Sequence, residues 1–76
     1  MKITAGYFNA QVGYRICQFN ALKFKEQNNT EEYNKYQTWA DEYAAQLDQD
    51  VLDKLQWELV RAQRKWRKTW LAEVKK

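Results

Sequence analysis

Residues 30–47 read TEEYNKYQTWADEYAAQL, and this stretch has the clearest helical periodicity in the chain. Its apolar residues recur at alternating steps of three and four, which places them on one face of an α-helix. These residues are Tyr33, Tyr36, Ala40, Tyr43 and Leu47. Thr30, followed by Glu31 and Glu32, predicts the helix start, because a hydroxyl can accept from free backbone amides and acids favour the positive end of the helix dipole. An amphipathic helix is therefore predicted over residues 30–47.

A second amphipathic helix is predicted over residues 50–74, with Asp48 or Asp50 as its cap. Its apolar positions are Leu52, Leu55, Leu59, Ala62, Trp66 and Trp70. This helix would be about 37 Å long, against about 27 Å for residues 30–47. If the two pair as an antiparallel hairpin, the far end of the longer helix extends past its neighbour. That end contains the most basic part of the chain.

Residues 5–26 are predicted to form the first helix, with a short extended lead-in at residues 2–4 and Thr4 as its cap. Two apolar stripes run along it, one of Phe8, Val12, Ile16 and Phe19, and one of Gly6, Ala10, Gly13 and Cys17. The small residues of the second stripe would let another backbone approach closely, which explains a glycine inside a helix. A strand remains the alternative for residues 5–20, because apolar and polar residues also alternate there.

The predicted fold class is all-α, in one domain spanning residues 1–76. The architecture is a small three-helix bundle or a helical hairpin plus a packed N-terminal helix. A domain of 76 residues is near the size at which disulfides, a metal or a partner chain are usually needed for stability. Cys17 is the only cysteine and there is no histidine. The first helix therefore either packs into a groove between the other two or contacts a second chain in a homodimer.

Little in the sequence points to catalysis. The chain has no serine and no histidine, which excludes a serine triad and a Cys–His pair. Cys17 is predicted to be a buried structural thiol, and the acidic clusters are explained by helix capping. We expect no enzyme activity, no cofactor and no metal. The first residues lack the apolar stretch of a signal peptide, and no run could span a bilayer, which predicts a soluble cytoplasmic protein with no membrane association.

The charge distribution is the strongest functional signal. Residues 28–58 carry eight acids against two bases, for a net charge of −6, whereas residues 59–76 carry seven bases against one acid, for +6. The basic residues cluster on the side of the last helix away from Leu59 and Trp66, together with three apolar residues. The candidate partner-binding residues are Trp57, Val60, Arg61, Arg64, Lys65, Arg67, Lys68 and Leu71.

Three interpretations of this surface remain open. Tryptophan and arginine dominate protein interface hot spots, so the leading hypothesis is a protein-binding module. Its small size and lack of catalytic residues are typical of an inhibitor or adaptor encoded by a phage or other mobile element and acting on a host or defence protein. The alternatives are a nucleic-acid-binding regulator, whose bases contact phosphates, and a structural subunit that self-assembles.

Overall fold

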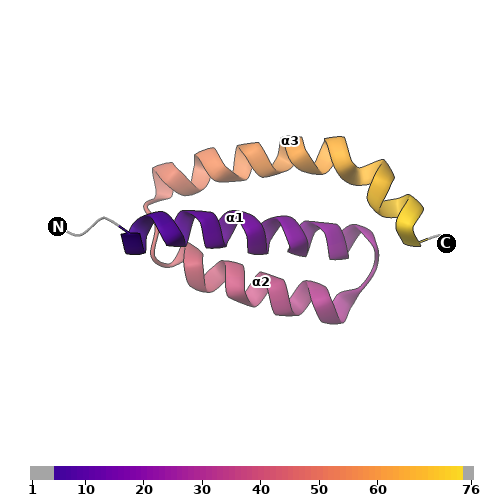
Figure 1. Ribbon diagram of the computed structural model, residues 1–76, viewed down its shortest axis with the longest axis horizontal. Coiled ribbons are helices and arrows are strands. Elements are labelled where there is room, and N and C mark those ends of the chain that lie inside the picture. Colours follow the sequence, from indigo (N-terminus) through magenta and orange to yellow (C-terminus); the bar gives the residue numbers. More distant parts are fainter. Residues whose placement is uncertain (1–4, 75–76) are drawn as a thin grey trace.

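The computed structural model describes the backbone of residues 5–74 and the side chains from Asn9 to Val74. It contains three helices, α1 (Ala5–Glu26), α2 (Thr30–Ala44) and α3 (Gln49–Val74), and no strand in the described residues (Figure 1). The all-α fold class is confirmed, and residues 5–20 are helical. The expected lead-in at residues 2–4, the cap at Thr4 and the side chain of Phe8 lie outside the described part.

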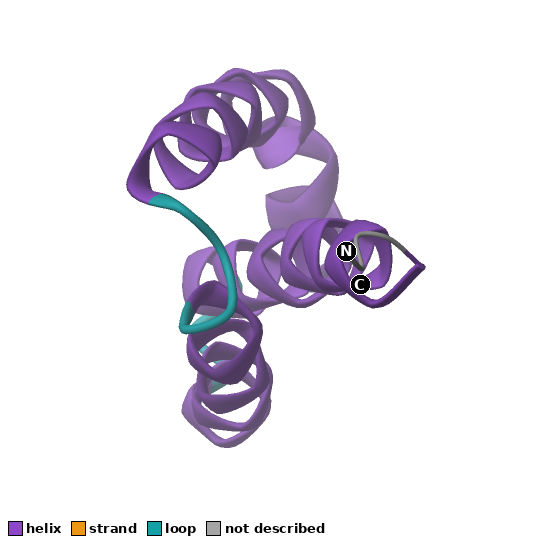
Figure 2. Ribbon diagram, turned by 90° about the vertical axis from the view of Figure 1, so that its left-hand side faces the viewer, coloured by secondary structure: helices purple, strands orange, loops and turns teal. Residues whose placement is uncertain are grey.

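The central helix of the fold is α1. It packs against both neighbours. The α2 helix runs antiparallel to α1, whereas α3 runs parallel to α1 (Figure 1). The predicted hairpin of the second and third helices is antiparallel, but α2 and α3 make few direct contacts and diverge from each other (Figure 2). The molecule is elongated, since its radius of gyration is 13.4 Å, against about 11 Å for a compact chain of this length.

Asparagines form the break between α1 and α2. The backbone N–H of Asn29 donates to the Phe24 carbonyl at 2.8 Å and that of Asn28 to the Lys25 carbonyl at 3.1 Å. Asn28 has φ 59°, which is a left-handed conformation. A helix that ends with its following amides bonded back to its last carbonyls requires this conformation, and asparagine tolerates it. Asn29 then caps α2, because its Oδ1 accepts from the Glu32 N–H at 3.2 Å. The expectation that Thr30 is the cap is wrong, and Thr30 is the first helical residue.

The break between α2 and α3 comes earlier than expected. The helix ends at Ala44 rather than Leu47, because the Gln46 and Leu47 amides turn back to the carbonyls of Tyr43 and Ala44 in tighter, three-residue steps. Leu47 is nevertheless buried, as its place in the apolar stripe predicts. Asp48 immediately precedes α3, and its backbone carbonyl accepts from the Leu52 amide at 3.0 Å.

The interface between α1 and α2 is built from small residues. Ala10, Ala21 and Ala40 are almost fully buried. A Cβ atom on Gly13 would lie only 2.6 Å from Cζ of Tyr43, so the tyrosine ring rests directly on the glycine. The predicted close approach along the stripe of small residues is therefore present in the fold.

The interface between α1 and α3 uses larger side chains. Leu55 and Leu59 are buried, and Phe19 meets the buried Trp70 edge-on at 5.2 Å. Tyr14 is 3% exposed, and its hydroxyl accepts from Nε2 of Gln56 at 3.4 Å. A buried tyrosine hydroxyl usually needs such a partner.

Among the residues whose side chains are described, three on the predicted apolar stripes are not covered. Trp66 is 43% exposed, Val12 38% and Ile16 56%. Placing Trp66 inside was wrong. Of the two alternatives left open for the first helix, complete coverage of both of its stripes by the other two helices is not what the structure has, because Val12 and Ile16 are exposed. Tyr14 and the small stripe of α1 occupy the space between the helices, which leaves Val12 and Ile16 at the surface.

Candidate protein-binding face of α3

The surface of α3 opposite to the core carries most of the candidate residues. Leu55, Leu59 and Trp70 are buried toward α1. Positions at steps of three and four on the other side share one face. We call this the outer face of α3, and its members are Trp57, Val60, Arg61, Arg64, Lys68 and Leu71. Among them Leu71 is half-buried and the rest are exposed.

Trp57 is the most exposed large apolar side chain among the described residues, at 70%. It stands between two shallow hollows. One is lined by Asp53, Gln56, Trp57, Val60 and Arg64, and the other by Lys54, Trp57, Glu58 and Arg61. The indole is therefore a projecting apolar group with concave, charged surroundings on both sides.

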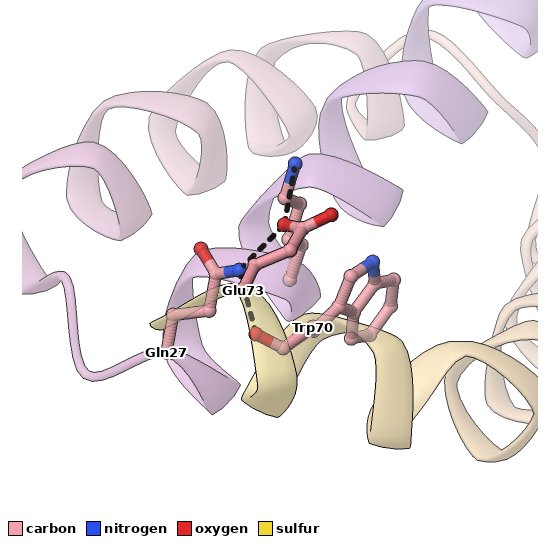
Figure 3. A network of polar contacts seen from close by, with 4 residues as sticks. Gln27, Trp70 and Glu73 are labelled. Atoms are coloured by element: carbon pink, nitrogen blue, oxygen red, sulfur yellow. Dashed lines mark hydrogen bonds and ion pairs between the residues drawn. The ribbon is translucent and has the colours of Figure 1, made fainter. Parts of the chain in front are cut away.

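The basic end of α3 is partly tied to α1. Nε2 of Gln27 donates to the Trp70 carbonyl and to Oε1 of Glu73, both at 3.0 Å, and Nζ of Lys23 lies 3.7 Å from the same carboxylate oxygen (Figure 3). These contacts hold the last turns of α3 where the helix bends toward the end of α1 (Figure 1). The end that was expected to extend past its neighbour therefore packs on α1.

Glu26 also holds α3 against α1, and it pairs with Arg67, one of the candidate partner-binding cations. Its Oε1 accepts from Nε of Arg67 at 3.1 Å, and its Oε2 accepts from Nε2 of Gln63 at 2.8 Å. Arg67 is thus held by a carboxylate of the same chain. A substitution at Arg67 would disturb the packing of α3 on α1 as well as any external contact.

The other candidate cations are available. Arg61, Arg64, Lys65 and Lys68 are exposed and form no ion pair with a described residue. Acids also lie near Trp57: Asp53 lines one of its hollows and Glu58 the other. The surroundings of the indole therefore carry both signs of charge, with the excess positive charge toward the C-terminal side.

Other chemistry is sparse in the part of the chain that the structure describes. No group of three or more histidine, cysteine, aspartate or glutamate side chains could hold a metal ion there. Cys17 is buried, and the loss of hydration raises the pKa of its thiol above the usual value. None of the three helices is long and apolar enough to cross a membrane.

Comparisons with protein-family models, with curated proteins and with solved structures find no match. A function for this chain therefore has to be inferred from its own residues. The sequence predicted which residues share the outer face of α3. It did not reveal that Glu26 and Gln27 hold the end of that helix. Their position just before the break after α1 was the available signal, because it places them at the end of the molecule that α3 reaches.

Proposed function

We propose that this chain is a non-enzymatic protein-binding module that docks its partner on the outer face of α3. The observation that carries the proposal is the exposure of Trp57, 70% of whose surface is open in a fold that has a buried position for Trp70. Burying one such side chain contributes about 1.5–3 kcal/mol to association. The free cations Arg61, Arg64 and Lys68 extend the surface beyond the indole.

The partner surface that fits has an apolar pocket for the indole and acidic groups beside it. Tryptophan and arginine are, with tyrosine, the residue types most enriched among the hot spots of protein interfaces. The carboxylates of Asp53 and Glu58 lie next to Trp57, where they would repel the phosphates of a nucleic acid. This mixture of charges favours a protein as the partner of the indole.

The test is capture of partners from the lysate of the native host on immobilised wild-type and variant chains. We expect Trp57→Ala to weaken capture by a factor of about 30, which corresponds to a hot-spot loss of about 2 kcal/mol. Arg64→Glu combined with Lys68→Glu should weaken it similarly while leaving the circular dichroism spectrum unchanged. Trp39→Ala is the matched control, since Trp39 is 43% exposed on α2.

Nucleic acid is the second candidate partner, favoured by the four cations that have no carboxylate partner in the described chain. Nuclease treatment of the lysate separates the two. Capture that disappears after nuclease treatment, and whose affinity falls steeply with salt, would assign the face to phosphates. Capture that survives nuclease but is equal for wild type and Trp57→Ala would contradict docking at this tryptophan.

A further inference from the structure

A shallow groove between α1 and α3 gathers the other exposed apolar side chains near the outer face of α3. The groove is lined by Val12, Arg15, Ile16, Phe19, Glu58, Leu59 and Ala62. Ile16 projects from its edge with 56% of its surface exposed, and Val12 is 38% exposed. Trp66, 43% exposed, follows Ala62 by one helical turn on the same side of α3. Apolar surface gathered in this way on a small protein usually marks an interaction site.

The groove adjoins the surface proposed for docking at Trp57. Glu58 lines the groove, and it also lines one of the two hollows beside the indole. On the groove side a guanidinium nitrogen of Arg15 lies 3.4 Å from Oε1 of Glu58. A protein seated on Trp57 therefore reaches the groove by crossing a single residue of α3.

On the basis of the docking function proposed above, we propose that the same protein partner also lays an acidic amphipathic α-helix in the groove between α1 and α3. The apolar side chains of that helix meet Val12, Ile16 and Trp66. Its carboxylates meet the cations that border the groove along α3. The shape of the groove, its lining and its charges each support this occupant.

The lining of the groove favours a helix over an extended segment. Apart from Arg15 and Glu58, which pair with each other, the lining is apolar and consists of Val12, Ile16, Phe19, Leu59 and Ala62. An extended segment would bring backbone N–H and C=O groups onto this apolar surface, where they would find no hydrogen-bond partner. The backbone groups of an α-helix are bonded within the helix, so only its side chains have to match the groove.

The length of the apolar track matches about three turns of a helix. Arg15 and Glu58 lie at the same level of the molecule, because their side chains pair. The two helices run in the same direction (Figure 1). Val12 lies about one turn before Arg15 on α1, and Trp66 lies about two turns after Glu58 on α3, so the track extends over roughly 16 Å. A helix with apolar residues at steps of three and four places three side chains on a track of this length.

Cations border the groove along α3. Lys54, Arg61 and Lys65 follow one another at steps of seven and four, so they share one side of the helix. Two of them, Lys54 and Arg61, line the hollow that also contains Trp57 and Glu58. All three are exposed, and none forms an ion pair with a described residue. A helix that carries carboxylates along one edge of its apolar stripe therefore meets opposite charges on α3 while its stripe covers the groove.

Nucleic acid is also negatively charged, but it fits this surface less well. Its phosphates would meet the cations of α3 and would leave the apolar side chains of Val12 and Ile16 uncovered. An acidic amphipathic helix covers both parts of the surface at once, because its charged and apolar residues lie side by side. The apolar lining and the cationic border together therefore favour a protein helix.

The first test maps the partner at the groove by photocrosslinking. A benzophenone amino acid takes the place of Val12 in the full chain, and the complex captured from nuclease-treated lysate of the native host is irradiated. We expect a crosslink to the protein that the wild-type chain captures through Trp57. Mass spectrometry of the crosslinked peptide should show a net negative charge and apolar residues at steps of three and four. The same photoprobe in place of Trp39, which is 43% exposed on α2, is the matched control and should give no crosslink to that protein.

The second test measures the affinity of that peptide, made synthetically, for the full chain by isothermal titration calorimetry. Ile16→Ala should weaken binding by about tenfold, because it removes the most exposed apolar side chain of the groove. Lys54→Glu combined with Lys65→Glu should weaken it by about tenfold or more at low salt and by less at high salt. Lys25→Glu is the matched control for charge, since Lys25 is exposed beside Tyr33 and away from the groove. Circular dichroism should show the same helix content for every variant.

Four results would overturn the proposal. The photoprobe at Val12 could give no crosslink while Trp57→Ala still weakens capture, which would leave docking at Trp57 standing without a helix in the groove. The crosslinked species could be nucleic acid or a second copy of this chain. The crosslinked peptide could be basic or lack the helical spacing. Ile16→Ala could bind the peptide as tightly as the wild type does.

The two proposals fail in different ways. A crosslink from Val12 to an acidic helical peptide that is equally strong in the Trp57→Ala background would support the groove as a helix site. The same result would contradict docking at Trp57.

Discussion

At the residue scale, replacing Gly13 by alanine beside Tyr43 would have two opposite effects on stability. Alanine in place of a helical glycine usually stabilises by about 1 kcal/mol. Here the added methyl group would lie 2.6–2.8 Å from three atoms of the Tyr43 ring, so the ring must move. Overpacking of this kind costs about 1–3 kcal/mol. We therefore expect Gly13→Ala to lower the free energy of unfolding by up to about 2 kcal/mol in urea denaturation.

A double-mutant cycle isolates the cause of that loss. In a Tyr43→Ala background the added methyl group meets no ring, and Gly13→Ala should then stabilise by about 1 kcal/mol. A loss of the same size in both backgrounds would contradict the close contact. The larger Gly13→Leu substitution should destabilise the wild-type background further, because more atoms must be accommodated.

Cys17 gives a second prediction at the same scale. Burial raises the pKa of its thiol, so less of the reactive thiolate forms in the folded chain than in the unfolded one. We expect a thiol reagent at mildly alkaline pH to react at least tenfold more slowly with the folded protein than with the urea-unfolded chain. Above the thiol pKa of the unfolded chain, unfolding releases a proton, so stability should fall as pH rises further. Equal rates in the two states would contradict burial.

At the scale of the element, the start of α2 differs from the sequence-based expectation. The cap is Asn29, whose Oδ1 accepts from the Glu32 N–H, while Thr30 is the first helical residue. We expect Asn29→Ala to lower the free energy of unfolding by about 1 kcal/mol, the usual cost of losing such a cap. Thr30→Ala is the matched control and should change it by less than about half that amount. If thermal denaturation showed a larger loss of stability for Thr30→Ala than for Asn29→Ala, Thr30 would be the cap.

The element that matters most for function is α3, because three of its sides have different roles. The inner side packs on α1 through Leu55, Leu59 and Trp70. The outer side presents Trp57, and a third side, which carries Ala62, leads to the exposed Trp66. Near its end, contacts from Gln27 and Glu26 to the carbonyl of Trp70 and to Arg67 hold the helix against α1. One helix therefore supports two exposed surfaces.

At the scale of the whole molecule, the open arrangement of the helices explains why so much apolar surface remains exposed. Because α2 and α3 make few contacts with each other, each packs mainly on α1, and the core that joins Tyr14 and Cys17 of α1 to Ala40 of α2 and Leu59 of α3 is narrow. A chain of 76 residues with such a core lies in the size range where self-association commonly adds stability.

The sequence by itself determined the second and third helices, the break at the asparagines and the membership of the outer face of α3, and it favoured a helix over a strand for residues 5–20. These features depend on periodicity and capping between residues a few positions apart. Only the tertiary structure decided which stripe of α1 is buried, that Trp66 is exposed while Trp70 is covered, and that Arg67 is held by Glu26. Those outcomes depend on how helices distant in the chain pack against one another, and a periodic pattern shows which residues share a face without showing what that face meets.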